Sequence, residues 1–355
     1  MPPELRTNNF NLLRLLFAYL VILSHSYPLT AHADREPLLR LSGGQATLGT
    51  VAVTAFFMIS GFLITRSWVG SRSLLQFLIK RVRRIYPAFI LATLLALVFF
   101  APIGANGPAY WHSVRWIRLI STTFCLLPSL PPTFTTLPVH GLNGAIWSIP
   151  WEFACYLAVP LAAAIGILRH RRFALVAFAL LMIAFAIKTY LHPTLPFPGR
   201  ILTAFAAGQI FYLYRHEIPY RAAYFLAALL LVIASILLPR LKLFELLIPI
   251  FGAYVLFYAA FARARFLDTI KKPLETFDIS YGVYLYGWPV QQLVVLKLGT
   301  KFDQLGLLTL ALVGSTVLGA LSWVLVEKPF LRNRASHQIA VEGPRHDLIE
   351  PAPST

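Results

Sequence analysis

The chain alternates between long apolar runs and short polar segments. A helix needs about 20 mainly apolar residues to cross the hydrocarbon of a bilayer, and about ten runs reach that length. They lie at 10–29, 48–66, 85–102, 145–168, 173–191, 199–215, 222–239, 243–262, 278–297 and 305–326. The pattern therefore predicts an all-α membrane protein, a bundle of about ten transmembrane helices.

The basic residues between these runs predict how the bundle is oriented. Twenty of the 31 Lys and Arg residues fall in one alternating set of loops and termini, and ten fall in the other. Cytoplasmic loops carry the excess of Lys and Arg, so both termini are predicted to be cytoplasmic. The net charge of +17 is spread over short runs between apolar segments, which does not indicate a nucleic-acid partner.

Composition supports a protein that lies mostly within the bilayer. Hydrophobic residues make up 58% of the chain and charged residues 13%, whereas soluble domains carry about 25% charged residues. We expect one transmembrane domain at 1–334, followed by a disordered cytoplasmic tail at 335–355 that is polar and contains several prolines. In the long outer loop at 103–144, the apolar segment Val114–Leu127 is too short to span and predicts a re-entrant or interfacial helix.

The first predicted helix carries two ionisable residues, Arg14 and His25, in an otherwise apolar run. Eleven residues separate them, so both lie on one helix face, about 16 Å apart along the axis. Ionisable side chains at membrane depth are rare and usually functional. The alternatives are an Arg14 that reaches the interface and a His25 that is hydrogen-bonded to a neighbouring helix.

Glu152, near the start of the fourth span, is a candidate partner for His25. His25 should lie about 22 Å from the cytoplasmic end of its helix, and Glu152 about 10 Å from the opposite surface. The two side chains therefore reach similar depth, and the carboxylate could orient the imidazole and raise its basicity. Alternatively, Glu152 pairs with another buried group.

Three further segments carry candidate site residues. Arg81 and Arg84 share a helix face at the cytoplasmic mouth of the third span, where guanidinium groups suit phosphates, or they are only topological charges. Ser60-Gly61 is a small pair in a bulky helix, which indicates close helix packing or room for a ligand. The aromatic stripe at 280–289 could form interface anchors or a polar cavity wall.

Together these motifs resemble the acyltransferase-3 family of integral membrane acyltransferases. The matching segments are Arg14-x10-His25, FFMISGFLITR at 56–66, RVRRIYP at 81–87, WSIPWEFACYLAVP at 147–160, SYGVYLYGWPV at 280–290 and Glu327-Lys328-Pro329. The resemblance implies a ten-helix fold and transfer of an acyl group, often acetyl, from cytoplasmic acyl-CoA to a hydroxyl of a surface glycan or related molecule. The chain departs from the family at Gly287, where many members have histidine, and it shows no fused SGNH-type domain.

The resemblance implies that His25 is the catalytic histidine and that Glu152 occupies the family's acidic position. It further implies that Arg14, Arg81 and Arg84 bind the donor. We expect the substrate cavity to be lined by Ser60, Trp147, Tyr156, Tyr281, Tyr286 and Trp288.

We therefore expect an O-acyltransferase in a bacterial inner membrane. It would use acyl-CoA, in the first instance acetyl-CoA, as donor substrate, with no permanently bound cofactor and no metal. The acceptor would be a glycan or a lipid-linked saccharide. Direct transfer and an acyl-histidine intermediate both remain open. The alternatives are a transporter of a glycan or lipid-linked sugar, and a structural or sensory membrane protein.

Overall fold

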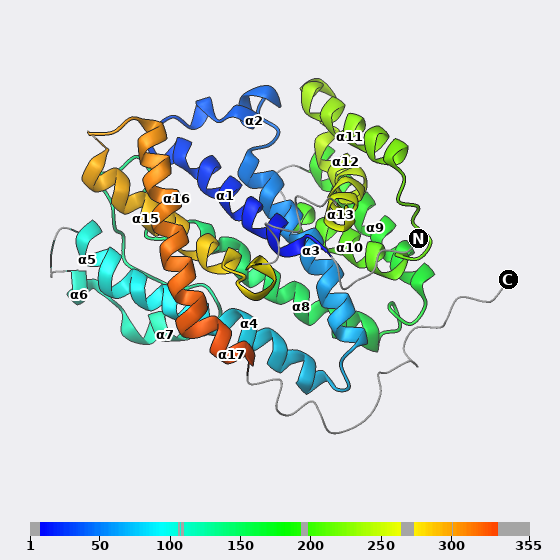
Figure 1. Cartoon of the computed structure of the whole chain (residues 1–355), viewed down its shortest axis with the longest axis horizontal. Helices are drawn as coiled ribbons and strands as arrows, with labels where there is room; N and C mark the ends of the chain where they lie inside the picture. The colour runs from blue at the N-terminus through cyan, green and yellow to red at the C-terminus, as the bar shows by residue number, and fades with distance from the viewer. Residues whose placement is uncertain are drawn as a thin grey trace.

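The computed structural model describes residues 8–105, 107, 110–192, 198–263, 273–299 and 301–332. Within these ranges the protein is a bundle of helices without a strand (Figure 1). The predicted tail at 335–355 lies outside the described residues.

The long helices and the short segments between them have the following bounds. The longer helices are α1 Phe10–Leu29, α3 Leu48–Val69, α4 Leu74–Leu95, α8 Ile149–Ala164, α9 Arg171–Tyr190, α10 Gly199–Leu213, α11 Ala222–Leu237, α13 Ala253–Phe261, α15 Ser280–Leu298 and α16 Gln304–Ser322. The short helices are α2 Pro37–Leu41, α5 Ala101–Gly104, α6 Tyr110–Ser113, α7 Trp116–Phe124, α12 Phe244–Leu247 and α17 Lys328–Arg332. Short 3-10 turns lie at Ala33–Arg35, Ala145–Ser148 and Pro239–Leu241, and π-helical turns at Ala96–Phe100, Ile248–Gly252 and Trp323–Glu327.

Seven described segments are long and apolar enough to cross a membrane, and each overlaps a predicted span. They are Phe10–Leu29, Leu48–Val69, Leu74–Gly104, Ala145–Ala164, Arg171–Tyr190, Phe244–Phe261 and Gln304–Leu331. The other three predicted spans correspond to α10, α11 and α15. The α-helical membrane bundle is therefore confirmed, while the count of ten and the cytoplasmic termini stay predictions.

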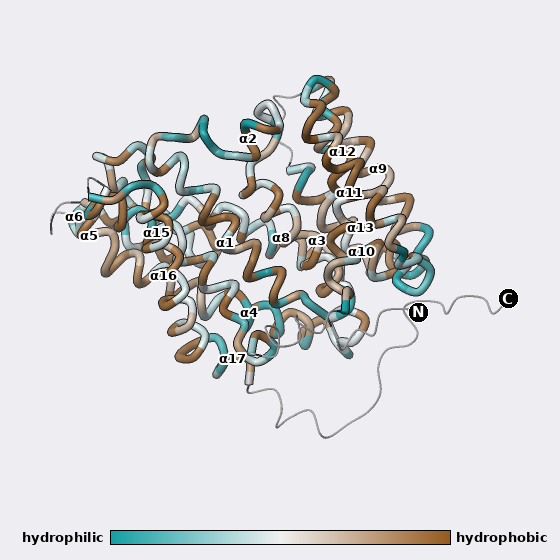
Figure 2. The backbone as a smooth tube through the Cα atoms, turned by 45° about the horizontal axis from the view of Figure 1, so that its top comes forward, coloured by the Kyte–Doolittle hydropathy of each residue, from teal (hydrophilic) through white to brown (hydrophobic). Residues whose placement is uncertain are grey.

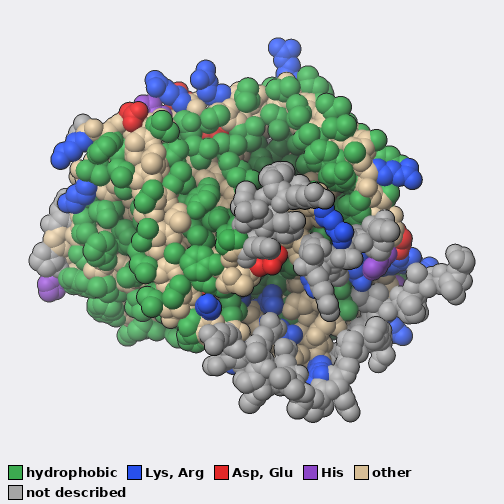
Figure 3. Space-filling model, viewed as in Figure 1, with side chains coloured by type: hydrophobic (Ala, Val, Ile, Leu, Met, Phe, Trp, Pro, Cys, Tyr) green, Lys and Arg blue, Asp and Glu red, His purple; other side chains and the backbone are tan. Residues whose placement is uncertain are grey.

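The outward face of the bundle has the character of a lipid-facing surface. Apolar side chains such as Leu230 and Leu325 are 65% and 68% exposed. Figure 3 shows hydrophobic side chains over much of the visible face, and Figure 2 shows apolar residues along most helices, with polar ones mainly in the connections. Exposed apolar area on this scale fits a helical bundle embedded in lipid.

α4 begins earlier than the sequence predicted. Its first residue is Leu74 rather than 85, because the Ser73 hydroxyl accepts a hydrogen bond from the Gln76 backbone N–H at 3.1 Å and caps the helix. Arg81 and Arg84 therefore lie two to three turns inside the helix rather than at its entrance.

The small pair Ser60-Gly61 serves helix packing on one side. A Cβ at Gly61 would overlap the Phe205 backbone of α10, and a Cβ at Gly208 of α10 would overlap the Met58 backbone of α3. The two glycines therefore let the backbones of α3 and α10 touch. The close-packing interpretation is confirmed for Gly61.

The predicted re-entrant or interfacial helix is present as α7, which is shorter than the segment Val114–Leu127. The Tyr86 hydroxyl donates to the Phe124 carbonyl at 2.8 Å. Tyr86 lies near the middle of the continuous helix Leu74–Gly104. The end of α7 therefore contacts the middle of that helix and not its end. This placement favours the re-entrant alternative.

Candidate active site

Two cavities lie at opposite ends of α1. The arginine cavity, of about 240 Å³, has among its lining residues Arg14, Ser60, Arg81, Arg84, Glu152, Tyr156 and Tyr281. The histidine cavity, of about 440 Å³, has among its lining residues His25, Thr47, Thr50, Thr54, Trp147, Lys188, Arg200 and Glu245. The structure thus separates the predicted site residues into two groups.

In the arginine cavity, Arg14 and Arg84 share one carboxylate. Arg14 Nη1 lies 2.9 Å from Asp278 Oδ2, and Arg84 Nη2 lies 2.7 Å from the same oxygen. Ser280 Oγ also donates to the other Asp278 oxygen, at 2.6 Å. This shared carboxylate joins α1, α4 and the start of α15.

Sequence reasoning missed Asp278. Its partners lie 264 and 194 residues away in the chain, so no local spacing reveals the contact. The available signal was an acidic residue at the first position of the predicted ninth span, in a chain with only 14 Asp and Glu residues.

Glu327, from the closing Glu-Lys-Pro segment, adds a second carboxylate on the same side. It is 2% exposed, its Oε2 lies 3.9 Å from Arg84 Nη1, and its Oε1 accepts a hydrogen bond from Ser322. The segment Trp323–Glu327 is thereby joined to Arg84 of α4.

Glu152 does not contact His25, which corrects the pairing that the depth argument predicted. Its carboxylate instead accepts a short hydrogen bond from the Tyr156 hydroxyl, one turn further along α8, and one from Ser60 Oγ at 3.4 Å. Pro150 lies in the first turn of α8, and from there Glu152 faces the arginine cavity. The depth estimate did not identify the partner of Glu152, because it says nothing about the direction in which a side chain points.

Arg81 lies over the ring of Tyr156. Its guanidinium carbon is 5.7 Å from the centre of the Tyr156 ring, and its Nη2 donates to Ser67 Oγ at 3.2 Å. The arginine cavity therefore brings together all three predicted donor-site arginines, together with Ser60, Glu152, Tyr156 and Tyr281.

His25 is held by aromatic packing. Its ring meets Trp288 edge to face, with ring centres 4.9 Å apart, and Trp288 Nε1 donates to the Gly141 carbonyl at 3.4 Å. Gln292 Nε2 donates to the Gly141 and Val139 carbonyls. Among the described residues, none forms a hydrogen bond with the His25 ring, so its nitrogens can act on a molecule in the cavity that the ring lines.

A buried carboxylate fixes the end of α1 that carries His25. Glu36 is 1% exposed and accepts hydrogen bonds from the backbone N–H groups of Leu39 at 2.6 Å and Leu48 at 2.7 Å, and from Ser24 Oγ at 3.4 Å. It therefore caps α2 and the start of α3 while holding the neighbour of His25. Sequence reasoning missed this residue as well.

Tyr284 lies between the two cavities. It and Val53 line both of them. The Tyr284 hydroxyl donates to the Ala145 carbonyl at 2.6 Å, so its 2.7 Å contact with Ser148 Oγ has Ser148 as the donor. Sequence reasoning did not single out Tyr284, although it lies in the aromatic stripe.

Two predicted cavity residues of α15 line neither of these cavities. Tyr286 is 1% exposed and buried in the bundle, and Trp288 packs behind His25. Helical geometry explains why Tyr286 points away from both cavities. Residues two apart in a helix point in directions about 200° apart, and Tyr284 faces the cavities. Trp147 does line the histidine cavity.

Position 287 faces α1. A Cβ at Gly287 would lie 2.7 Å from Cγ1 of Ile22. The position at which the family resemblance implies a histidine is therefore filled here by a side chain of α1.

Comparisons with known proteins agree with this architecture. The family described as "Acyltransferase domain" matches residues 7–326. An "O-acetyl transferase" of Shigella phage Sf6 is 28% identical over 95% of this chain and 99% of its own length. "Nodulation protein 10" of Rhizobium leguminosarum bv. viciae is 26% identical over 93% of this chain and 94% of its own.

"Acyltransferase MdmB" of Streptomyces mycarofaciens is 31% identical over 45% of this chain and 40% of its own length. No solved structure matches at a significant level. The family match spans both cavities and nearly the whole helical bundle, and the chain therefore belongs to the acyltransferase-3 family of integral membrane acyltransferases.

Proposed function

We propose that the protein is an O-acetyltransferase of the bacterial inner membrane that modifies a cell-surface or exported glycan. The donor is cytoplasmic acetyl-CoA, which approaches through the arginine cavity, and the acceptor hydroxyl enters the histidine cavity. The observation that carries the proposal is the arrangement of the two cavities, which share Val53 and Tyr284 as a common wall. The name of the phage relative, an O-acetyl transferase, supports the reaction class.

The charges favour the donor at the arginine end. Arg14, Arg81 and Arg84 bring three guanidinium groups to one cavity, and guanidinium groups suit phosphates. A cavity of about 240 Å³ is smaller than a drug-sized site, so it admits the acyl-pantetheine arm while the nucleotide stays at the basic entrance.

His25 supplies the chemistry at the other end. In direct transfer, the neutral imidazole takes the proton of the acceptor hydroxyl while its oxygen attacks the thioester carbonyl. The thiolate of CoA then leaves and receives that proton. In the two-step route, the imidazole itself attacks the thioester, and the thiolate leaves and takes a proton from the acylated ring. The acceptor hydroxyl then displaces the acyl group from the ring, which takes up the hydroxyl proton.

The test is transfer of labelled acetyl from acetyl-CoA to glycan by the full-length protein in nanodiscs. His25→Ala should lower the rate by about 10²–10⁴-fold, the usual contribution of a general base. His32→Ala is the matched control, because among the described residues the His32 side chain is hydrogen-bonded only to Thr30, at 3.3 Å, and it lines neither cavity. Equal rates for the two variants would contradict the proposal.

A second measurement separates the two chemical routes. The protein is mixed with labelled acetyl-CoA in the absence of acceptor, quenched and digested. Label on the peptide that carries His25 selects the two-step route, and its absence at times from one turnover onward selects direct transfer.

A further inference from the structure

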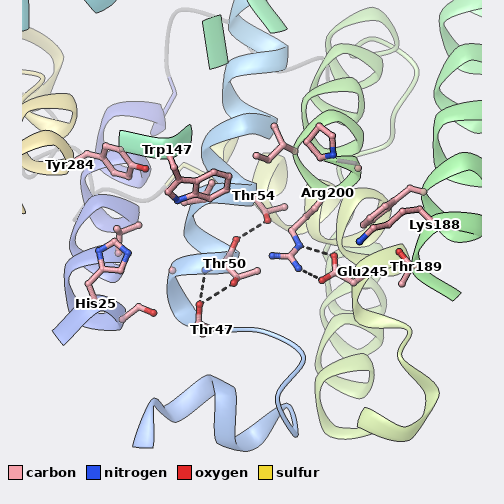
Figure 4. Close-up of a pocket in the computed structure, with 18 residues that line it drawn as sticks. His25, Thr47, Thr50, Thr54, Trp147, Lys188, Thr189, Arg200, Glu245 and Tyr284 are labelled. Atoms are coloured by element: carbon pink, nitrogen blue, oxygen red, sulfur yellow. Dashed lines mark hydrogen bonds and ion pairs between the residues drawn. The ribbon is translucent and has the colours of Figure 1, made fainter. Parts of the chain in front are cut away.

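The far end of the histidine cavity contains a charged group that the proposed chemistry does not use. Arg200 of α10 and Glu245 of α12 form a two-fold ion pair, with Arg200 Nε 2.7 Å from Glu245 Oε2 and Nη2 bonded to Oε1. Lys188 of α9 lines the same cavity. Figure 4 shows these three side chains on one side of α3 and His25 on the other.

A polar stripe connects the two ends of this cavity. Thr47, Thr50 and Thr54 lie on successive turns of α3 and are hydrogen-bonded to one another: Thr47 Oγ1 and Thr50 Oγ1 are 3.0 Å apart, and Thr54 Oγ1 donates to the Thr50 carbonyl at 2.7 Å. The stripe extends about 10 Å along the helix. Opposite it, the indole of Trp147 is 50% exposed and offers an apolar face.

The charges of this cavity do not cancel. Glu245 is neutralised by Arg200, and no ion pair between Lys188 and another described residue is present. With His25 neutral, the surplus is one positive charge. A surplus cation in a partly enclosed cavity attracts a ligand of the opposite sign more strongly than it would in bulk water.

We infer that the end of the histidine cavity formed by Lys188, Arg200 and Glu245 binds an anionic group of the acceptor saccharide. A sugar unit would lie along the threonine stripe under Trp147, its reacting hydroxyl at His25 and its anionic group at Lys188. The group is a carboxylate of the sugar or a phosphate linked to it. The inference rests on the proposed function, since it names the class of acceptor for that reaction.

The test uses full-length protein, labelled acetyl-CoA and the unmodified envelope glycan extracted from a deletion strain. The glycan is separated by anion exchange into a neutral and an anionic pool, and each pool is titrated as acceptor. The anionic pool should take the label, and its KM should rise with added salt. Label confined to the neutral pool would overturn the inference.

Variants test the lysine directly. Lys188→Glu should raise the KM for the anionic pool by about tenfold or more, as expected for loss of a charge-assisted contact, and Lys188→Arg should restore it. Lys188→Gln should remove most of the salt dependence while keeping the fold. Lys297→Glu is the control, because Lys297 is exposed near the end of α15 and lines neither cavity. Equal KM values for Lys188→Glu and Lys297→Glu would overturn the inference.

The two possible sources of charge are separated on the labelled product. Reduction of activated carboxylates removes the charge of a uronic acid, whereas mild acid releases a sugar from a phosphate linkage. If wild type labels neither pool in a His25-dependent manner, the proposed function fails and the inference falls with it. Labelling of the neutral pool alone overturns only the inference.

Discussion

The two ends of α1 are built on opposite principles. At one end, Arg14 is fixed by Asp278, which Arg84 shares. At the other end, His25 lines a cavity with its ring packed on Trp288 and no hydrogen bond from the described residues. The comparison teaches that one helix can carry an ion-paired arginine at one end and, at the other, a candidate catalytic histidine whose ring has no hydrogen bond from the described residues.

The largest effect on stability is expected at the end of α1 that carries Arg14. Asp278→Ala leaves the largely buried Arg14 without its ion-pair partner, and Arg84 keeps only the more distant Glu327 at 3.9 Å. The change should destabilise the protein by about 3–5 kcal/mol. Thermal unfolding of the detergent-solubilised protein measures this change. Asp303→Ala is the matched control, because Asp303 accepts only from the Gly306 N–H at the start of α16, and loss of such a cap costs about 1 kcal/mol. Similar losses for both variants would remove the contrast between the two ends.

Glu152→Gln sharpens the contrast in function. Loss of the charged acceptor of the Tyr156 and Ser60 hydroxyls should lower kcat/KM for acyl-CoA by about ten- to a hundredfold, with the acceptor KM unchanged. The pH–rate profile should keep its shape, because Glu152 does not contact His25. If Glu152→Gln instead shifted the part of the profile that reports His25, the pairing of Glu152 with His25 predicted from depth would be supported.

Glu245→Gln should show the converse, a changed KM for the acceptor with unchanged kinetics for the donor.

Gly61→Ala tests the scaffold that both cavities share. A methyl group there overlaps the Phe205 backbone of α10, and overpacking costs about 1–3 kcal/mol. Thermal unfolding is again the measurement. Gly70→Ala should be nearly neutral, because its nearest neighbour would be the Arg66 carbonyl at 3.5 Å. If both variants were neutral, α3 and α10 would not be in direct backbone contact.

The smallest effect is expected at the wall between the cavities. Tyr284→Phe removes the hydrogen bonds to Ala145 and Ser148, which should cost about 1 kcal/mol and lower kcat a few-fold. Tyr258→Phe is the control, since Tyr258 is engaged through ring stacking on Phe225. A rate equal to that of the control would exclude a role for the Tyr284 hydroxyl in separating the cavities.

Patterns within one helix were readable from the sequence. The helical class and the common helix of Arg14 and His25 follow from hydrophobic length and the spacing of two polar residues. The close approach of α3 at Gly61 follows from a small residue in a bulky run. Each of these depends on neighbours in the chain.

Relations between helices were not readable in the same way. Asp278 meets Arg14 across 264 residues, and Arg200 meets Glu245 across 45. Glu152 was predicted to reach His25, but its side chain lines the arginine cavity, because hydropathy does not give the rotation of a helix about its axis. Tyr286 failed as a cavity residue for the same reason.

The contact between Gly287 and Ile22 has an evolutionary consequence. Members of the family with histidine at the position of Gly287 must make space for an imidazole where α1 now presents a branched side chain. The two positions should therefore have changed together during divergence, and introducing the histidine into this protein should need a smaller residue at 22 in the same step.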